Sequence, residues 1–491
     1  MQAVSGKINQ VFTLTIGNAV VSLLNLLAAP FLVRWLSTDH FGTYNQVIMI
    51  CMVFQTLSTF SLHGAVSPLL TRFAQKKDLV LSTCLRLFFY SAIVVSAICL
   101  FSTQLVSVAF SNPELARLLP VATIYFTGQA IIPILNSVLY FHGLVRQSVF
   151  HNVIFTGFRI LLMFLIIHGS ADLFMLLLCI GLVSWTQAFF LFFSIPVKMR
   201  LVSRFDTEIS KSAIQISRPL TLSSFLERIL YNVDGFTVSV LLSAGAFAYY
   251  KAGAIDVPLI ASLGTAAFSV VLPQISQLFY EGNHSEITRI KRSVMATIAF
   301  FTYPVLVFIL FFHREIIGFY LTERYLPAAI VFAVYNLVIL LKVYDWQDVI
   351  VLSGNSKGIF YYTALALLLN VILSPILVLF MGFIGAAVAF VISLFFLGFL
   401  QLRKMSAILN CHITDLMNPF IILKILGTSV AMALLFKFIT GVVELENLTV
   451  CLMFLPFLVA TYWVNKKLGL LPHEITAYFK SKNRLFDSIL R

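Results

Sequence analysis

Charged residues are scarce in this sequence. Asp, Glu, Lys and Arg together make up 11% of the 491 residues, whereas a typical soluble domain contains roughly 25%. Hydrophobic residues make up 60%, and a water-soluble fold of this size could not bury so much apolar surface. A bilayer removes this constraint, because a membrane-spanning helix needs about 20 apolar residues. The composition excludes a soluble protein and predicts an all-α polytopic membrane protein.

The sequence also lacks cysteine motifs. Its six cysteines form no CxxC pair, and five of them fall inside apolar stretches. A free cysteine in such a stretch acts as a small hydrophobic residue. We therefore expect no metal site, no disulfide framework and no cofactor.

A cleavable signal peptide and a long hydrophilic segment are missing as well. The first apolar stretch, 11–33, is longer than the short apolar core of a signal peptide, so we expect a retained helix. The largest internal connection runs from about Pro196 to Arg218, and the tail after Asn465 is short. Because no soluble catalytic domain fits in these connections, we expect a protein that is not an enzyme and that works among its helices.

About fourteen apolar stretches are long enough to span a bilayer. The predicted spans are 11–33, 43–66, 79–107, 116–141, 147–168, 172–195, 219–241, 246–272, 291–312, 326–352, 358–380, 383–401, 417–440 and 447–464.

Lys and Arg gather in alternate connections between these spans. The basic set includes Lys76, Arg146, Lys291 and Arg403. The other set holds only Arg34, Arg117, Arg314 and Arg324. Because cytoplasmic loops collect Lys and Arg, the basic set is predicted to face the cytoplasm, with both termini on that side. The net charge of +13 then reflects membrane topology, and we expect no nucleic-acid partner.

A short motif occurs twice. Residues 36–44 and 242–250 both read L-S-x3-F-x2-Y, and comparable turns lie at 143–146 and 354–357. The separation covers six predicted spans, an even number, so the two halves are expected to be parallel repeats. The alternative is coincidence in apolar sequence. The predicted organisation is an N-terminal six-helix lobe (1–196), a basic cytoplasmic linker (197–218), a C-terminal six-helix lobe (219–401), an additional helix pair (402–464) and a basic cytoplasmic tail (465–491).

Several charged residues lie inside the predicted spans, where each costs roughly 2.5–3.5 kcal/mol at a helix centre. The cations that we assign to a substrate-binding cavity are Arg159, Arg228, Lys342, Arg86 and Lys251. The acids that we assign to charge balance or ion coupling are Glu227, Asp234, Asp256, Asp345 and Asp348. Two alternatives remain open: side chains near helix ends can snorkel to the interface, and central charges can form internal salt bridges.

The spacing of these charges predicts shared helix faces. Glu227 and Asp234 are seven residues apart, and Lys342, Asp345 and Asp348 recur every three residues. The first half offers Arg159, with Asn18, Asn25, Gln55 and Gln129 as uncharged polar groups. A cationic cavity suits an anionic substrate such as a diphosphate or an acidic sugar, because Arg binds phosphate oxygens in a fork.

The stretch from Arg34 to Tyr44, RWLSTDHFGTY, resembles the R-x-L-G-P-x-x-F/Y-G-x-Y link after the first helix of Wzx-type O-antigen flippases. These flippases belong to the multidrug/oligosaccharidyl-lipid/polysaccharide exporter superfamily. The segments 62–73 and 232–250 are similar to two further regions of these proteins, and Gly385-Ala386-Ala387 fits the start of their twelfth helix. The sequence departs from the pattern where Ser37-Thr38 replaces Gly-Pro and where Ala248 replaces a glycine.

This resemblance implies two six-helix lobes in a V shape around a central cavity, and alternating access. The implied substrate is an undecaprenyl-diphosphate-linked oligosaccharide, moved from the cytoplasmic to the periplasmic leaflet of the bacterial inner membrane for surface polysaccharide or lipopolysaccharide synthesis. Membrane lipids are expected partners, polysaccharide polymerase and chain-length proteins are candidate partners, and H⁺ and Na⁺ are candidate coupling ions. Two alternatives are a drug or cation antiporter of the same superfamily and a membrane polysaccharide polymerase or ligase. The antiporter would need a more acidic cavity, and the polymerase or ligase would need a large periplasmic loop.

Overall fold

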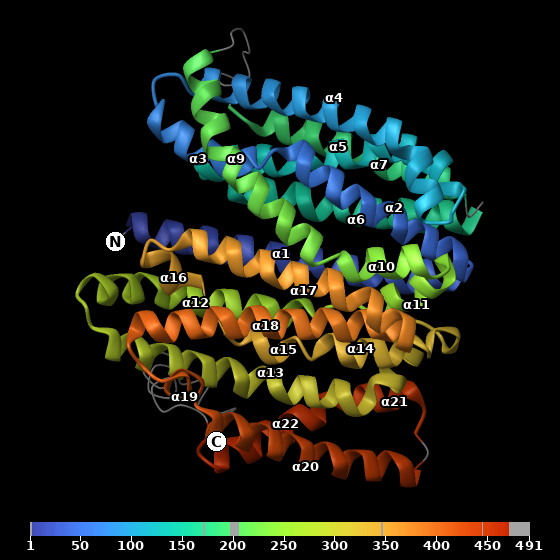
Figure 1. Ribbon diagram of the computed structural model, residues 1–491, viewed down its shortest axis with the longest axis vertical. Helices are drawn as coiled ribbons and strands as arrows, with labels where there is room; N and C mark the ends of the chain where they lie inside the picture. Colours follow the sequence, from blue (N-terminus) through green and yellow to red (C-terminus); the bar gives the residue numbers. More distant parts are fainter. Residues whose placement is uncertain (1, 170–171, 197–205, 345–346, 444, 471–491) are drawn as a thin grey trace. The chain divides into compact units, whose positions relative to one another are not determined.

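The computed structural model describes residues 2–169, 172–196, 206–344, 347–443 and 445–470, and all regular elements within them are helices (Figure 1). The all-α prediction is therefore confirmed. The helices are α1 (Gln2–Trp35), α2 (Thr38–Thr59), α3 (Leu62–Arg72), α4 (Lys77–Ala109), α5 (Glu114–Phe141), α6 (Val145–Gly169), α7 (Leu173–Ser194), α9 (Thr207–Leu230), α10 (Val233–Leu241), α11 (Ala244–Gly253), α12 (Pro258–Tyr280), α13 (His284–Tyr320), the 3-10 turn η1 (Glu323–Tyr325), α14 (Ala328–Asn336), α15 (Ile339–Lys342), α16 (Gln347–Leu352), α17 (Ser356–Met381), α18 (Phe383–Leu409), α19 (Ile413–Met417), α20 (Pro419–Val443), α21 (Asn447–Leu452) and α22 (Phe454–Lys467).

Eleven helical stretches within the described residues are long and apolar enough to cross a membrane. Each of them overlaps one of the predicted spans, and the chain is a multi-pass membrane protein. One of these stretches, Thr38–Arg72, joins α2 and α3 across a short break.

The other three predicted spans are not single helices. The span 219–241 is divided between α9 and α10, 246–272 between α11 and α12, and 326–352 among α14, α15 and α16. The expectation of a continuous helix was wrong at these places. At two of these breaks a side-chain amide donates a hydrogen bond to a backbone carbonyl group. Asn232 Nδ2 donates to the carbonyl of Arg228 at 2.7 Å near the end of α9, and Asn336 Nδ2 donates to the carbonyl of Ile255 at 3.1 Å between α11 and α12. Breaks inside a membrane protein require such replacement partners.

The chain forms two compact units. The first comprises Met1–Lys251 with Ser374–Ala386, and the second comprises Ala252–Leu373 with Ala387–Arg491. In the first unit α5 packs against α2, α4 and α7, while α1 packs against α6 (Figure 1). In the second unit the long helix α13 packs against α12, α14 and α20. Apolar side chains fill these contacts, including Phe88 and Leu135 in the first unit and Phe300 and Phe312 in the second.

The two copies of the repeated motif have the same local role. Ser37 caps α2 by accepting a hydrogen bond from the His40 amide, and Ser243 accepts one from the Ala246 amide at the start of α11, both at 3.2 Å. The two links also touch each other within the first unit. A Cβ on Gly42 would lie 2.0 Å from the carbonyl oxygen of the facing α11 residue, so only glycine permits this approach.

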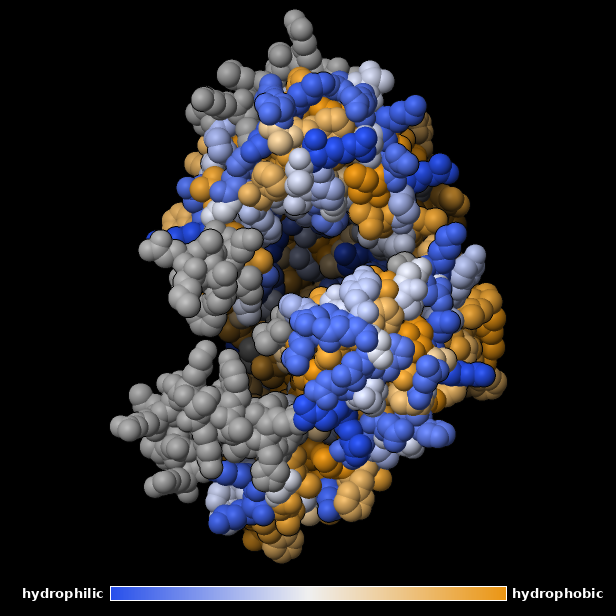
Figure 2. Space-filling model, turned by 90° about the vertical axis from the view of Figure 1, so that its left-hand side faces the viewer, coloured by the Kyte–Doolittle hydropathy of each residue, from blue (hydrophilic) through white to orange (hydrophobic). Residues whose placement is uncertain are grey.

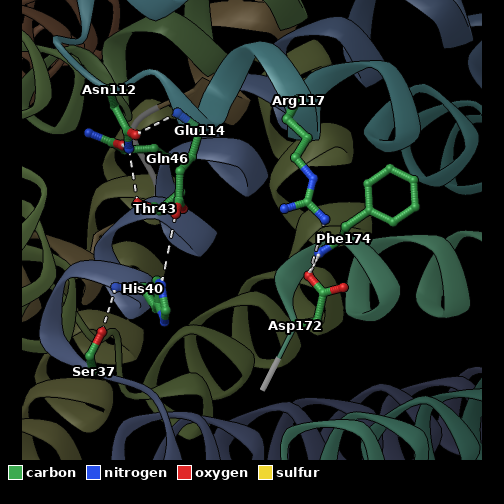
Figure 3. A network of polar contacts seen from close by, with 9 residues as sticks. All are labelled: Ser37, His40, Thr43, Gln46, Asn112, Glu114, Arg117, Asp172 and Phe174. Atoms are coloured by element: carbon green, nitrogen blue, oxygen red, sulfur yellow. Dashed lines mark hydrogen bonds and ion pairs between the residues drawn. The ribbon is translucent and has the colours of Figure 1, made fainter. Parts of the chain in front are cut away.

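Polar contacts hold one end of the first unit together (Figure 3). Asn112 Nδ2, in the turn between α4 and α5, donates to Thr43 Oγ1 at 2.9 Å and to Gln46 Oε1 at 2.7 Å. Arg117 lies 3.9 Å from the carboxylate of Asp172, which caps α7. Because both partners of this ion pair are solvent-accessible, it contributes about 1 kcal/mol at most. These contacts position helices.

At the opposite end of this unit α3 ends and α4 and α9 begin (Figure 1). Many hydrophilic residues lie on the face that Figure 2 shows. Lys76 Nζ donates to Asp206 Oδ2 at 3.0 Å and so ties the turn before α4 to the cap of α9. This hydrogen bond raises the pKa of Lys76. The backbone amide of Ile209 and the Lys76 ammonium lower the pKa of Asp206.

Candidate functional site

A polar cavity of about 400 Å³ lies within the first unit. Pockets that bind small ligands commonly measure about 300–1,000 Å³. Residues of α2, α3, α5 and α9 line this open cavity, and most of the lining side chains are polar. They are Gln55, Thr56, Thr59, Ser61, His63, Pro133, Ser224, Glu227, Arg228 and Tyr231.

One wall of the cavity is the break between α2 and α3. Phe60 and Ser61 both adopt the left-handed backbone conformation there, with φ of 47° and 44°. Non-glycine residues in this conformation cost of order 1–3 kcal/mol each and persist only where surrounding contacts hold them. The Thr59 hydroxyl donates to the Ala130 carbonyl of α5 at 3.2 Å, and Ser91 of α4 donates to the Ser58 carbonyl at 2.6 Å. Contacts with α4 and α5 therefore fix the break.

The break between α9 and α10 contributes another part of the lining. The buried Asn232 side chain binds the carbonyl of Arg228, and α9 ends at Leu230, two residues after Arg228. The last turn of α9 consequently presents Glu227 and Arg228 to the cavity, with Tyr231 beside them. A polar cavity between two interrupted helices is an arrangement that membrane transporters use to bind substrates near the bilayer midplane.

The electrostatics of the cavity come mainly from Glu227 and Arg228. Neither side chain forms a salt bridge within the described part of the chain, and both are exposed to the cavity. The guanidinium of Arg228 can bind a phosphate or carboxylate through two parallel hydrogen bonds. Hydroxyl groups of Thr56, Ser61 and Tyr231 line the rest of the wall and suit the hydroxyls of a sugar. The cavity can therefore hold an anionic group beside a polyhydroxylated one.

The predicted shared face of Glu227 and Asp234 is not present. The two residues lie on different helices, because α9 ends at Leu230, and Asp234 is only 3% exposed. Asp234 accepts a hydrogen bond from the Tyr250 hydroxyl instead of facing the cavity. Lys251, on α11, lies within electrostatic reach of both Asp234 and Arg228.

Arg159 and Arg86 also lie in the first unit, away from the cavity lining. Arg159 Nη2 donates to Asn25 Oδ1 at 3.0 Å and connects α6 to α1. Arg86 is half-buried on α4, one turn from the exposed Phe89 and Tyr90.

Of the remaining predicted charges, Lys342, Asp256 and Asp348 lie in the second unit, and each forms an ion pair. Lys342 forms an ion pair with Asp256, which lies in the break between α11 and α12. Asp348 lies on α16 and accepts a hydrogen bond from Lys291 at 2.6 Å. The predicted shared face of Lys342 and Asp348 is wrong, because α15 ends at Lys342 and a separate helix carries Asp348. Asp345 lies outside the described residues.

Sequence reasoning missed Lys291 and most of the cavity lining. Lys291 was predicted to lie in a cytoplasmic connection, yet its side chain is fully buried, because α13 begins at His284 and places it two turns inside the helix. Its ammonium also lies 5.5 Å from the centre of the Phe268 ring. His63, Ser61 and Ser224 were not singled out. The available signal was that Thr56 and Thr59 follow the predicted polar residue Gln55 towards the end of an apolar stretch.

Metal-binding clusters of three or more His, Cys, Asp or Glu residues do not occur among the residues that the structure describes.

Comparison with known proteins gives a family and a fold. The sequence profile of the family described as "Polysaccharide biosynthesis protein" matches residues 31–330. No curated protein matches the sequence. The structure is similar to that of a lipid II flippase, MurJ, in an inward closed conformation, with 17% identity, a TM-score of 0.73, and coverage of 93% of this chain and 99% of that chain.

Two transporters of the MATE family also share this fold. An inward-facing multidrug resistance MATE transporter of the MOP superfamily is 15% identical, with a TM-score of 0.62 and coverage of 79% of this chain and 95% of that one. A eukaryotic MATE transporter is 14% identical, with a TM-score of 0.55 and coverage of 82% and 100%. These likenesses show that the chain has the fold common to MurJ and MATE transporters.

Proposed function

Because the chain belongs to the polysaccharide biosynthesis protein family and has the fold of MurJ and MATE transporters, we propose that it is a flippase for a lipid-linked oligosaccharide. The substrate is an undecaprenyl-diphosphate-linked oligosaccharide, moved by alternating access from the cytoplasmic to the periplasmic leaflet of the bacterial inner membrane. The product supplies the synthesis of a surface polysaccharide such as O-antigen. Both chain termini lie in the cytoplasm, in keeping with the distribution of Lys and Arg.

The observation that carries this proposal is the cavity lined by Arg228. It combines a guanidinium with several hydroxyl groups and one amide, which matches a diphosphate attached to a sugar. Its volume of about 400 Å³ accommodates only part of the polar head group. The polyprenyl tail stays in the bilayer, whose hydrocarbon solvates it at no cost.

In this proposal Arg228 binds the diphosphate, and the neighbouring carboxylate of Glu227 prevents binding from becoming too tight for release. Arg159, Lys251, Arg86 and Lys342 are proposed as further cationic contacts along the path. Asp234, Asp256, Asp345 and Asp348 are proposed to balance that charge, and one of them exchanges a coupling H⁺ or Na⁺. This assignment follows from the cost of placing charges in a membrane, which marks such residues as functional candidates.

A reconstituted assay tests the proposal. Liposomes that contain the purified chain receive a fluorescent lipid-linked oligosaccharide, and a membrane-impermeant glycosidase reports the fraction exposed on the outer leaflet. We expect translocation with the oligosaccharide substrate and none with the free sugar. If the substrate remains on its original leaflet while the chain transports organic cations against a proton gradient, the protein is an antiporter and the proposal is wrong.

A further inference from the structure

Two recesses lie along the C-terminal half of α7 in the first unit, and the proposed transport cavity includes neither of them. One is apolar, measures about 670 Å³, and lies between α4, α5 and α7, with Phe89, Trp185 and Phe190 in its walls. The other measures about 540 Å³ and lies between the start of α6 and the end of α7. Its walls mix polar and aromatic side chains: Arg146, Gln147, Phe150, His151, Phe193 and Ser194.

The two recesses are neighbours. The ring of His151, in the polar recess, stacks on the ring of Phe190, in the apolar groove, with centroids 6.3 Å apart. Phe189 of the groove and Phe193 of the polar recess are also in ring contact, at 4.5 Å. A hydrogen bond of 3.0 Å between His151 and Ser194 joins α6 to α7 beside this boundary. The aromatic rings therefore form one surface that leads from a polar end to an apolar end.

The polar end lies at the interface and the apolar end lies deeper in the membrane. Ser194 is the last residue of α7, and Thr186, which lines the apolar groove, precedes it by eight residues, a rise of about 12 Å along a helix. Arg146 lies in the first turn of α6, on the side that the distribution of Lys and Arg assigns to the cytoplasm. This arrangement matches a lipid with its head group at the cytoplasmic interface and a chain directed towards the bilayer centre.

The charge of the polar recess identifies the type of head group. Arg146 is exposed, and none of the described residues that line this recess is acidic. The amide of Gln147 supplies a further donor. Basic pockets between transmembrane helices on the cytoplasmic side bind anionic lipid head groups, which are abundant in that leaflet.

We propose that this surface is a binding site for an anionic phospholipid. The phosphate contacts Arg146 and Gln147, and one acyl chain lies along Phe193 and Phe190 into the apolar groove. The site would attach a lipid to α6 and α7 independently of the transported substrate.

Lipid retention in native mass spectrometry tests the site. The full-length chain is prepared in nanodiscs of phosphatidylglycerol and phosphatidylcholine, and the lipids retained after mild detergent release are counted. Arg146→Gln removes the head-group contact, Thr186→Trp fills the apolar groove, and Arg403→Gln is the matched control, since it removes an exposed cation from the second unit. We expect retained phosphatidylglycerol to fall about tenfold in Arg146→Gln, as expected for loss of a charge-assisted hydrogen bond, to fall in Thr186→Trp, and to remain unchanged in the control.

Four outcomes would overturn the proposal. Equal retention of phosphatidylglycerol and phosphatidylcholine by the wild-type chain would mean that charge does not select the lipid. Displacement of phosphatidylglycerol by inorganic phosphate, or an unchanged Thr186→Trp variant, would mean that the acyl groove takes no part. Retention that is lost only when a lipid-linked diphosphate competes would assign the surface to the transported substrate.

Discussion

Replacement of Arg228 by glutamine is expected to reduce transport of the lipid-linked oligosaccharide about tenfold. A hydrogen bond to a charged group contributes about 1.5–3 kcal/mol, and each 1.4 kcal/mol is a factor of about ten. We take the lower end of this range because the Arg228 side chain is exposed to a water-accessible cavity and lies beside a carboxylate, where screening weakens the interaction.

The lysine variant separates charge from geometry. Arg228→Lys keeps the positive charge but loses the planar fork that binds two phosphate oxygens, so it is expected to recover only part of the activity. Both variants should be folded, since no side-chain hydrogen bond or salt bridge of Arg228 within the described residues is lost.

The assay measures the amount of surface polysaccharide in a strain that lacks the chromosomal gene and expresses each variant. Arg403→Gln is the control for loss of a cation elsewhere. Protein abundance in the membrane is measured in parallel, so that a folding defect is not mistaken for a transport defect. Wild-type polymer levels in Arg228→Gln at wild-type abundance would refute the assignment of this residue to the substrate.

Three further predictions concern stability. Replacing Lys291 by methionine should lower the free energy of unfolding by about 3–5 kcal/mol, because it removes the ammonium group that faces the buried carboxylate of Asp348. The thermal transition temperature of the purified chain should fall accordingly, and replacing both partners with apolar residues should restore much of the loss. Gly42→Ala should lower the thermal transition temperature, because the alanine Cβ would lie 2.0 Å from a backbone oxygen. Gly157→Ala should not lower it, because no atom lies within 4 Å of the added Cβ. The pKa of Asp206 is lowered in the folded chain, so the ion pair with Lys76 contributes to the free energy of unfolding at neutral pH. This contribution should shrink as the pH falls below about 4. An Asp206→Asn variant whose stability difference from wild type does not depend on pH would contradict this.

Much of the fold follows from the sequence because apolar length is a strong signal in a membrane. A backbone in lipid must satisfy its own hydrogen bonds, so a long apolar stretch has few alternatives to a helix. The breaks were not predictable in the same way. Phe60, Ser61, Tyr231 and Asn232 include neither glycine nor proline. Hydrogen bonds with α4 and α5 hold the break between α2 and α3, whereas the side chain of Asn232 itself binds a carbonyl group at the end of α9.

The candidate site was predicted in part. The depth of Arg228 and Glu227 in an apolar stretch marked both residues, and the structure brings them to one cavity. Helical spacing misled the assignment of Asp234, because the rule that residues seven apart share a face holds only within a continuous helix. The partner of Asp348 was missed for a related reason: Lys291 belongs to a helix that begins earlier than its apolar stretch.

The interrupted helices and the charges within the membrane have a common physical origin. A break exposes backbone groups that need polar partners, and a charge at that depth needs a partner or a wet cavity. Asp234 with Tyr250, and Lys291 with Asp348, meet this need through protein partners. Arg228 lies at a break, lines a cavity, and has no salt-bridge partner among the described residues. A cation that forms no salt bridge with any described residue is the one that a substrate phosphate would stabilise most.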